Sequence, residues 1–306
     1  MLRYAIRRLL WAIPVLVGVT LVTFILLHIV PGDPALNMLG EHPDPQTVEK
    51  LRRQLGLDRP LPQQYWDFLS HAAVGDLGTS YYRKVPVTQL IAQRFPVTAT
   101  IALSAMAVGA ALGLSTGILA GVRHRTFWDT GSMAVALAFI SAPIFWTALL
   151  AQLLLGFRWG ILPISGWEGP IYVVMPALVL GTRYAASIAR YTRSSLLEVI
   201  RQDYIRTARA KGLGERVIIY RHTLKNALIP VVTIMGLELG GLLTGSILTE
   251  TIFGIPGLGL LTLDALTSRD MPLVQGTVVF TAFVFVISNL VVDLSYAWLN
   301  PRIRYA

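Results

Sequence analysis

The sequence contains no cysteine, which excludes disulfide bonds, cysteine-based metal sites and a cysteine nucleophile. Charge is scarce as well: 14% of the 306 residues are charged, whereas soluble domains carry about a quarter. Hydrophobic residues take the place of the missing charge, at 54% of the chain, and occur in long runs. Such a surface is stable in lipid, so the sequence predicts an integral membrane protein.

Motifs of catalysis and cofactor binding are also missing. No Gly-x-x-x-x-Gly-Lys-Ser/Thr phosphate loop occurs, so the chain does not bind ATP in that way. The five histidines lack metal-ligand spacing, and we predict neither a metal nor a cofactor on this chain. The stretch 113–117 formally matches a Gly-x-Ser-x-Gly nucleophile elbow, but that serine requires a strand-to-helix turn and here lies in an apolar helical run. We predict that the chain is not an enzyme.

Six apolar runs supply the roughly 20 residues that a helix needs to cross about 30 Å of hydrocarbon. The fourth run is the weakest because Arg183 lies inside it. The first follows Arg7 and Arg8, as a secretory signal would, but it is longer than a signal core and no Ala-x-Ala cleavage pattern follows. We therefore expect an all-α polytopic membrane protein with spans at 9–30, 98–122, 130–157, 171–191, 227–249 and 274–299.

The basic residues predict the orientation of these spans, because cytoplasmic loops are enriched in lysine and arginine. With both termini in the cytoplasm, most of the 26 basic residues fall inside, and the two shorter outer loops carry only Arg158 and Arg269. This topology already explains the net charge of +9, so no nucleic-acid partner is predicted. The chain then divides into 1–30 (cytoplasmic end and first span), 31–97 (extracytoplasmic loop), 98–299 (transmembrane core) and 300–306 (cytoplasmic tail).

The loop 31–97 carries helix signals of its own. Asp44 is a good cap and Pro45 suits a first helical position, and Gly56 ends that helix. A second amphipathic stretch around Tyr65 ends near Gly75. We expect two short helices over the outer face of the membrane domain.

A polar segment at 192–226, between the fourth and fifth spans, is the most informative part of the chain. Asp203 can cap a short helix over 204–211, and Gly212 can end it. A further helix from Glu215 then leads into the fifth span.

Within the predicted spans, glycines and acids stand out. Glycines at every fourth position of the second span leave one helical face flat, which predicts close packing against another helix. Acids in the fifth and sixth spans either line a translocation path or are neutral or paired groups that hold helices together. The glycines are Gly109, Gly113, Gly117 and Gly121, and the acids are Glu238 and Asp293.

The segment 203–213 resembles the coupling loop of peptide-type ABC importer permeases. The general signature is Glu-Ala-Ala-x-x-x-Gly; here Arg206, Thr207 and Ala208 take the first three places and Gly212 the last, without the glutamate, as is usual in the peptide branch. The stretches 31–34, 55–58, 75–78, 250–259 and 269–272 also resemble this family, so the resemblance covers nearly the whole chain. The long first outer loop and the Phe-x-x-Pro-Gly-Leu-Gly pattern resemble the B-type permease of the pair.

The resemblance implies a type I ABC importer permease fold and half of the translocation path for a small peptide or similar solute. It implies a second homologous permease, two ATPase subunits that bind ATP and magnesium, and an extracytoplasmic substrate-binding protein, in a bacterial or archaeal inner membrane. Relatives handle dipeptides, oligopeptides, glutathione, nickel complexes or sugars. The residues expected to couple to the ATPase are Asp203, Arg206, Thr207, Ala208, Lys211, Gly212 and Leu213.

Two other classes of protein are weighed against this expectation. A self-contained secondary transporter would use ion-coupling acids, often in an inverted repeat, and no repeat is visible here. An intramembrane protease would need a serine–histidine pairing that the spans do not offer.

The absence of native cysteine makes the topology directly testable. A cysteine placed at Thr207 should react with a membrane-impermeant thiol reagent only after lysis, whereas one placed at Ser70 should react in intact spheroplasts. The opposite pattern of labelling at either site would overturn the six-span topology.

Overall fold

The computed structural model describes residues 2–29, 34–39 and 44–299, and within them the chain forms helices and no β-strand. The stretch 31–33 and the tail 300–306 therefore lie outside the described residues. In chain order, the helices are α1 (Leu2–Ile29), α2 (Pro34–Leu39), α3 (Pro45–Gln54), α4 (Leu61–Ala73), α5 (Val87–Val122), α6 (Phe127–Ser141), α7 (Ile144–Ala151), η1 (Gln152–Arg158), α8 (Ile171–Val199), α9 (Asp203–Ala210), α10 (Glu215–Val217), η2 (Ile218–Thr223), α11 (Leu224–Leu243), α12 (Ile247–Phe253), α13 (Leu258–Ser268) and α14 (Met271–Leu299).

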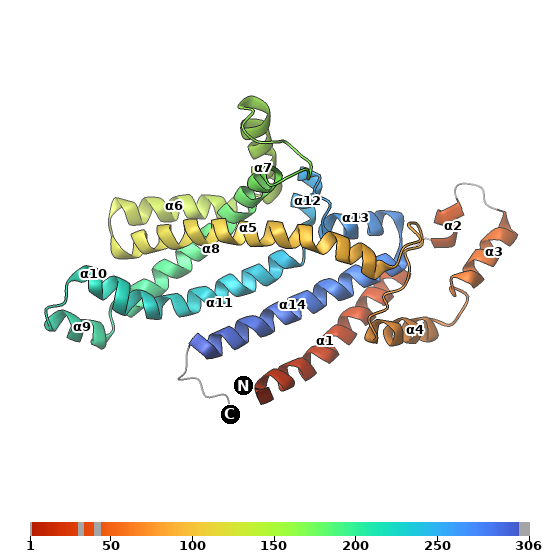
Figure 1. Cartoon of the computed structure of the whole chain (residues 1–306), viewed down its shortest axis with the longest axis horizontal. Helices are drawn as coiled ribbons and strands as arrows, with labels where there is room; N and C mark the ends of the chain where they lie inside the picture. Colours follow the sequence, from red (N-terminus) through yellow and green to blue (C-terminus); the bar gives the residue numbers. More distant parts are fainter. Residues whose placement is uncertain (1, 30–33, 40–43, 300–306) are drawn as a thin grey trace.

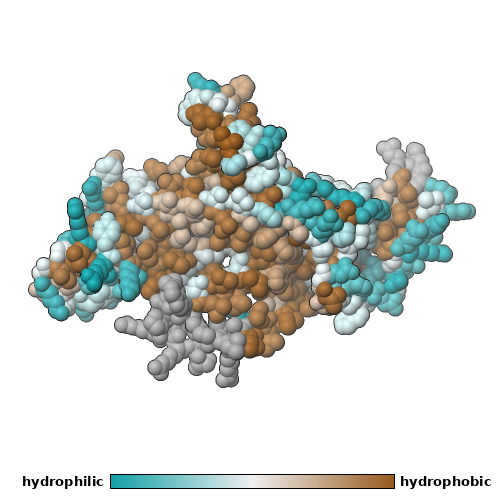
Figure 2. All heavy atoms as spheres, in the orientation of Figure 1, coloured by the Kyte–Doolittle hydropathy of each residue, from teal (hydrophilic) through white to brown (hydrophobic). Residues whose placement is uncertain are grey.

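Five uninterrupted helices among the described residues are long and apolar enough to cross a membrane: α1, α5, α8, the continuous stretch Glu215–Leu243, and α14. They pack side by side, α1 on α14, α14 on α11, and α11 on both α8 and α5 (Figure 1). Hydrophobic residues cover the middle of the molecule, and hydrophilic ones gather at the two ends formed by α9–α10 and by α2–α4 (Figure 2). The chain is thus a multi-pass membrane protein.

The prediction of one continuous span over 130–157 is wrong. Helix α6 ends at Ser141, and Ala142 adopts an extended conformation before α7 begins after Pro143. A proline disfavours helical geometry at the preceding residue, and the two helices are bent by 100°. Helices α7 and η1 consequently project away from the bundle (Figure 1).

The fifth predicted span, 227–249, also ends early. Helix α11 stops at Leu243, Gly245 has a left-handed φ of +97°, and α12 and α13 form a second bent pair at 92°. Each bent pair is either a broken span or a re-entrant loop, so the count of six spans stays a prediction. The fourth predicted span, in contrast, is one continuous helix in spite of Arg183.

The segment before α5 contains both of the short helices expected there. The Asp44 side chain accepts a hydrogen bond from Thr47 N at the start of α3, and Gly56 and Gly75 adopt left-handed φ values of +69° and +86° after α3 and α4. Helix α2 is an additional turn that the sequence pattern did not indicate.

The most extensive contact in the bundle joins α5 to α8 along the glycine face of α5. A Cβ atom added at Gly113 would lie 2.7 Å from Ala185 O, and one added at Gly117 would lie 2.6 Å from Ala189 O. Gly109 and Gly121 also face α8. The absence of side chains on this face therefore lets the two backbones approach more closely than any other residue would permit.

This contact predicts that replacing glycine by alanine lowers the stability at Gly117 but not at Gly18. Gly117→Ala should push α8 outward, because the new methyl group meets a backbone carbonyl, and should lower stability by about 1–3 kcal/mol. Gly18→Ala on α1, where nothing lies within 4 Å of the added Cβ, should be neutral or stabilising. Thermal unfolding of the two purified variants in detergent measures the difference. Equal melting temperatures would show that α5 and α8 do not meet in this register.

Candidate functional site

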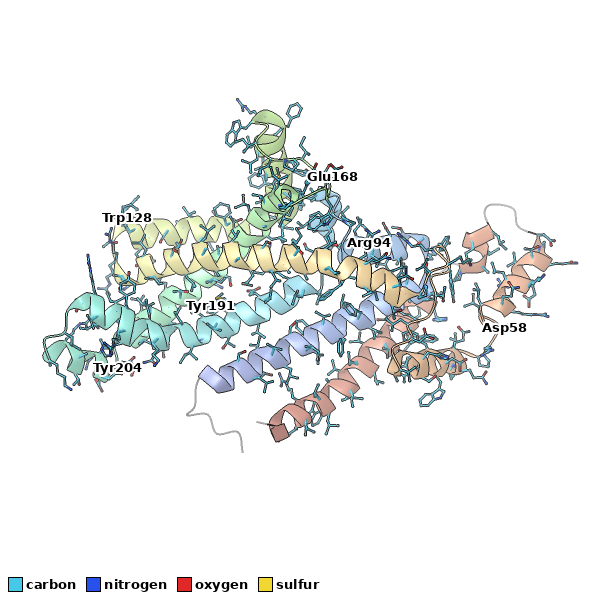
Figure 3. The ribbon with its side chains drawn as sticks, viewed as in Figure 1. Asp58, Arg94, Trp128, Glu168, Tyr191 and Tyr204 are labelled. Carbon is cyan, nitrogen blue, oxygen red and sulfur yellow. The ribbon has the colours of Figure 1, made fainter. Side chains whose placement is uncertain are left out.

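Helix α9 lies at one polar end of the molecule, between α8 and the α10–α11 stretch (Figure 1). Tyr204 marks it in Figure 3, at the end opposite to Asp58. The helix begins after Gln202, which has extended geometry, and the Asp203 side chain makes no capping hydrogen bond. The prediction that Asp203 caps the helix is therefore wrong. Asp203 lies in the first turn instead, where its negative charge interacts favourably with the helix dipole. Gly212, with a φ of +75°, follows the last turn.

One face of α9 is turned towards the chain itself. Ile205 and Ala208, three residues apart, pack on Ile218 of η2 and on Ile200 after α8. Ile205 and Ile218 are fully buried, and Ala208 is 7% exposed. Ala208, expected among the coupling residues, thus belongs to the base of the helix rather than to its open face.

Polar contacts brace α9 from the side. Arg209 Nε donates to Glu215 Oε1 at 2.7 Å, and this hydrogen bond raises the pKa of the Arg209 guanidinium. Asn226 Nδ2 donates to the Tyr204 hydroxyl at 2.8 Å. Helix α9 is therefore held at a fixed angle to the start of α11.

The opposite face of α9 and the turn after it are exposed and basic. Leu213 is 40% exposed, an apolar side chain beside these charges. The described part of the chain leaves this face uncovered. Its exposed residues are Asp203, Arg206, Thr207, Ala210, Lys211 and Leu213.

A buried carboxylate near the same end joins the α5–α6 turn to α8, and the sequence analysis missed it. Asp129 is 3% exposed and forms a bidentate pair with Arg193, with Nη2 3.0 Å from Oδ2. His124 Nδ1 and Arg125 N also lie within 3.0 Å of Asp129 Oδ2. The sequence does contain a signal for this pair: Asp129 directly precedes an apolar run in a chain that has few charges.

A second buried carboxylate fastens the bent pair α12–α13 to α5. Glu250 is 1% exposed, accepts from Thr98 Oγ1 at 2.9 Å, and accepts from Leu260 N at 2.9 Å. A Cβ added at Gly257 would lie 2.5 Å from the Glu250 carboxyl carbon. The glycine leaves room for the carboxyl group at the first turn of α13, where the Leu260 N–H donates to it.

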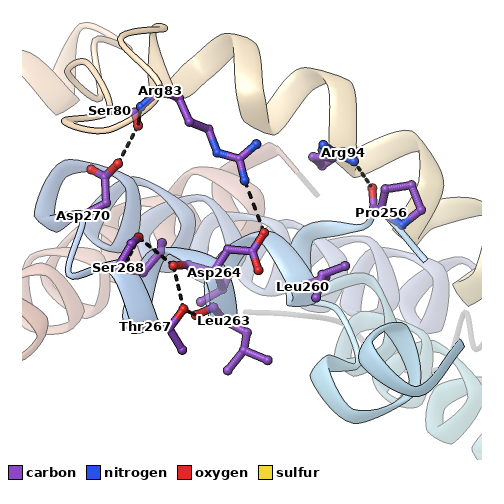
Figure 4. A network of polar contacts seen from close by, with 12 residues as sticks. Ser80, Arg83, Arg94, Pro256, Leu260, Leu263, Asp264, Thr267, Ser268 and Asp270 are labelled. Atoms are coloured by element: carbon purple, nitrogen blue, oxygen red, sulfur yellow. Dashed lines mark hydrogen bonds and ion pairs between the residues drawn. The ribbon is translucent and has the colours of Figure 1, made fainter. Parts of the chain in front are cut away.

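The loop between α4 and α5 docks on α13 and on the turn between α13 and α14 (Figure 4). Ser80 Oγ donates to Asp270, and Arg83 pairs with Asp264 at 3.2 Å. Asp270 also accepts from Tyr81 N, and burial together with the Asp270 charge raises the pKa of Tyr81 to about 12. Tyr81 thus stays protonated at physiological pH.

The two acids predicted within spans have different environments. Asp293 lies 2.7 Å from Arg8 Nη2, an ion pair that ties α14 to α1. Glu238 accepts from Ser187 Oγ at 3.3 Å, in the seam between α11 and α8. Asp293 thus joins two helices in this structure, whereas the hydrogen bond to Glu238 is long and comes from an uncharged serine.

Residues 113–305 match the family model described as the binding-protein-dependent transport system inner membrane component, and residues 1–102 match the model of the N-terminal part of such membrane components. The chain belongs to this permease family. Two relatives are each 43% identical to the permease over the full length of both chains. They are the dipeptide transport system permease protein DppB of Alkalihalophilus pseudofirmus and the glutathione transport system permease protein GsiC of Pectobacterium atrosepticum.

Solved structures of ABC transporters share the permease fold. An inward-facing MetNI methionine ABC transporter has a TM-score of 0.58 and 19% identity, covering 69% of this chain and 97% of that one. An amino acid ABC transporter with histidines has a TM-score of 0.54 and 16% identity, covering 71% and 95%. The expected ABC importer permease fold and the resemblance to the peptide branch are confirmed, and the secondary-transporter alternative is set aside.

The burial of Ala208 predicts that α9 needs this residue to stay folded, even in the absence of partner subunits. In the permease purified alone, Ala208→Glu should place a charge against Ile205 and Ile218 and loosen α9. Proteolysis or amide hydrogen exchange over 201–214 should then rise clearly. Thr207→Glu, on the exposed face of the same helix, should leave protection unchanged; equal exchange in both variants would contradict the described packing of α9.

Proposed function

We propose that this chain is one of two homologous permease subunits of a peptide importer in the cytoplasmic (inner) membrane of a bacterium or archaeon. Two ATPase subunits bind ATP and magnesium and drive transport, and the permease itself is non-catalytic. An extracytoplasmic binding protein delivers the cargo. Membership of the permease family and the names of the dipeptide and glutathione relatives support this proposal.

The observation that carries the coupling part of the proposal is the geometry of α9. Its inner face is fixed by Ile205 and Ala208, so a force applied to α9 is transmitted to η2 and the start of α11. Its exposed face carries Arg206 and Lys211, and none of the described elements covers it. A short, braced and basic helix of this kind suits an acidic cleft on an ATPase subunit.

The same arrangement supports the proposed orientation. The basic end at α9–α10 faces the cytoplasm, in accordance with the positive-inside rule, and six spans place both termini there. The opposite polar end, with α2, α3 and α4, then faces the binding protein (Figure 2). The division of the chain into 1–30, 31–97, 98–299 and 300–306 follows from this orientation.

Charge reversal on the exposed face of α9 tests the proposal. Arg206→Glu combined with Lys211→Glu should leave α9 folded, because both side chains are exposed, but should repel an acidic cleft. We expect the ATPase subunits to bind the permease pair at least tenfold more weakly, equivalent to about 1.4 kcal/mol, so that fewer of them co-purify with it. Substrate-stimulated ATP hydrolysis should fall in parallel.

Arg216→Glu is the matched control, since Arg216 is exposed at the same end but belongs to α10. Its complex should keep its ATPase subunits. If the double variant assembles and hydrolyses ATP like the wild type, the face of α9 is not the docking surface.

A further inference from the structure

The turn between α5 and α6 combines exposed aromatic rings with basic side chains. Phe127 and Trp128 are 83% and 53% exposed, and Arg123 and Arg125 are exposed beside them. The Arg123 guanidinium carbon lies 5.8 Å from the centre of the Trp128 ring. Trp128 lies at the end of the molecule where α5 and α6 meet (Figure 3). Tryptophan gathers where the hydrocarbon of a membrane meets the headgroups, so this turn belongs to one border of the bilayer.

A crevice of about 150 Å³ lies between α5, α6 and α8, and its walls lead to the same turn. On α6, the lining begins with Ser132, which follows Trp128 by one helical turn on the same face. On α8, the lining ends with Ala189, one turn before Arg193. The crevice therefore runs along the helices towards the border of the bilayer.

Polar contacts hold the three helices together where the crevice reaches the turn. Arg193 Nη2 lies 3.0 Å from Asp129 Oδ2 and 3.4 Å from His124 Nδ1. Thr116 lines the crevice from α5, and Arg123 follows it by two turns on the same face, about 10 Å further along. Positive charge from α5 and α8 thus meets at one end of the crevice.

The interior of the crevice offers contacts to carbon rather than to polar groups. Most of the residues that line it are apolar. The hydroxyls of Ser132 and Thr182 donate to carbonyl oxygens of their own helices, at 3.2 and 3.1 Å. An apolar cavity of about 150 Å³ holds a benzene-sized group, so this space suits a segment of an alkyl chain.

We propose that α5, α6 and α8 bind one anionic phospholipid, with a segment of an acyl chain in the crevice and the phosphate beside Arg123 and Arg125. Arg193 neutralises Asp129, so the two exposed arginines give this end a net positive charge. Guanidinium groups bind phosphate oxygens in bidentate geometry, and the Trp128 ring lies at the level of the headgroup. This partner goes beyond the proposed import function and is independent of the cargo.

Native mass spectrometry of the permease, purified with its partner subunits, tests the proposal. The probes are phosphatidylglycerol and phosphatidylcholine with the same acyl chains. The wild type should bind one phosphatidylglycerol about thirtyfold more tightly than phosphatidylcholine, since each of two basic residues at a membrane surface contributes about fivefold. Arg123→Gln combined with Arg125→Gln should abolish this preference.

Arg201→Gln combined with Arg216→Gln is the matched control for charge. Both residues are exposed at the same end of the molecule, but neither lines the crevice or belongs to the α5–α6 turn. This variant loses the same formal charge and should keep the preference for phosphatidylglycerol.

A second pair of variants tests the crevice itself. Ser132→Leu should fill it and prevent the retention of both lipids, whereas Ala134→Leu, on the exposed side of α6 away from the crevice, should bind like the wild type. Glycerol phosphate, which has the charge of the headgroup but no acyl chain, should not displace the bound lipid.

The inference is overturned if the wild type does not distinguish the two lipids or if the Arg123 and Arg125 double variant keeps the preference. Displacement by glycerol phosphate would show a simple anion site and would overturn it as well, even where Ser132→Leu fails to fold. Loss of a partner subunit from the double variant, with lipid binding unchanged, would assign this surface to a protein contact instead.

Discussion

The close approach of α5 and α8 is the contact on which the rest of the permease depends. Without side chains at Gly113 and Gly117, the two backbones meet directly, and α8 has no freedom to rotate about its own axis. The orientation of α8 in turn decides which of its residues face α11, which face α6 and which remain open. Arg193 reaches Asp129 on one side, while Ser187 reaches Glu238 on another.

A rigid α5–α8 pair is also what the proposed coupling through α9 would require. Helix α9 is attached to α8 by three residues and rests on Ile218, which precedes α11. Helix α9 therefore contacts elements that lead into two spans, and the buried Asp129–Arg193 pair connects α6 to α8 in the same way. Breaking such a pair leaves an uncompensated buried charge, so this connection resists partial rearrangement.

Much of this fold could be predicted from apolar runs, because lipid demands continuous helices of a minimum length. The same logic failed at 130–157 and 227–249, where hydropathy continues across Pro143 and Gly245 although the backbone turns. At the coupling segment, the turn at Gly212 followed from local chemistry. The burial of Ala208 could not be predicted, because it depends on contact with Ile218, ten residues later. The small side chain of an alanine also suits a buried position as well as a docking surface.

The crowding around Glu250 has a consequence for how the permease can change during evolution. A methyl group at position 257 would meet both the Glu250 carboxyl carbon and Thr98 Oγ1, at 2.5 and 2.6 Å. Any larger residue at 257 therefore becomes acceptable only after 98 and 250 have become smaller, and each intermediate sequence loses a buried hydrogen bond. Positions 98, 250 and 257 should thus co-vary among divergent permeases, or remain unchanged together, although the first of them is more than 150 residues away from the others.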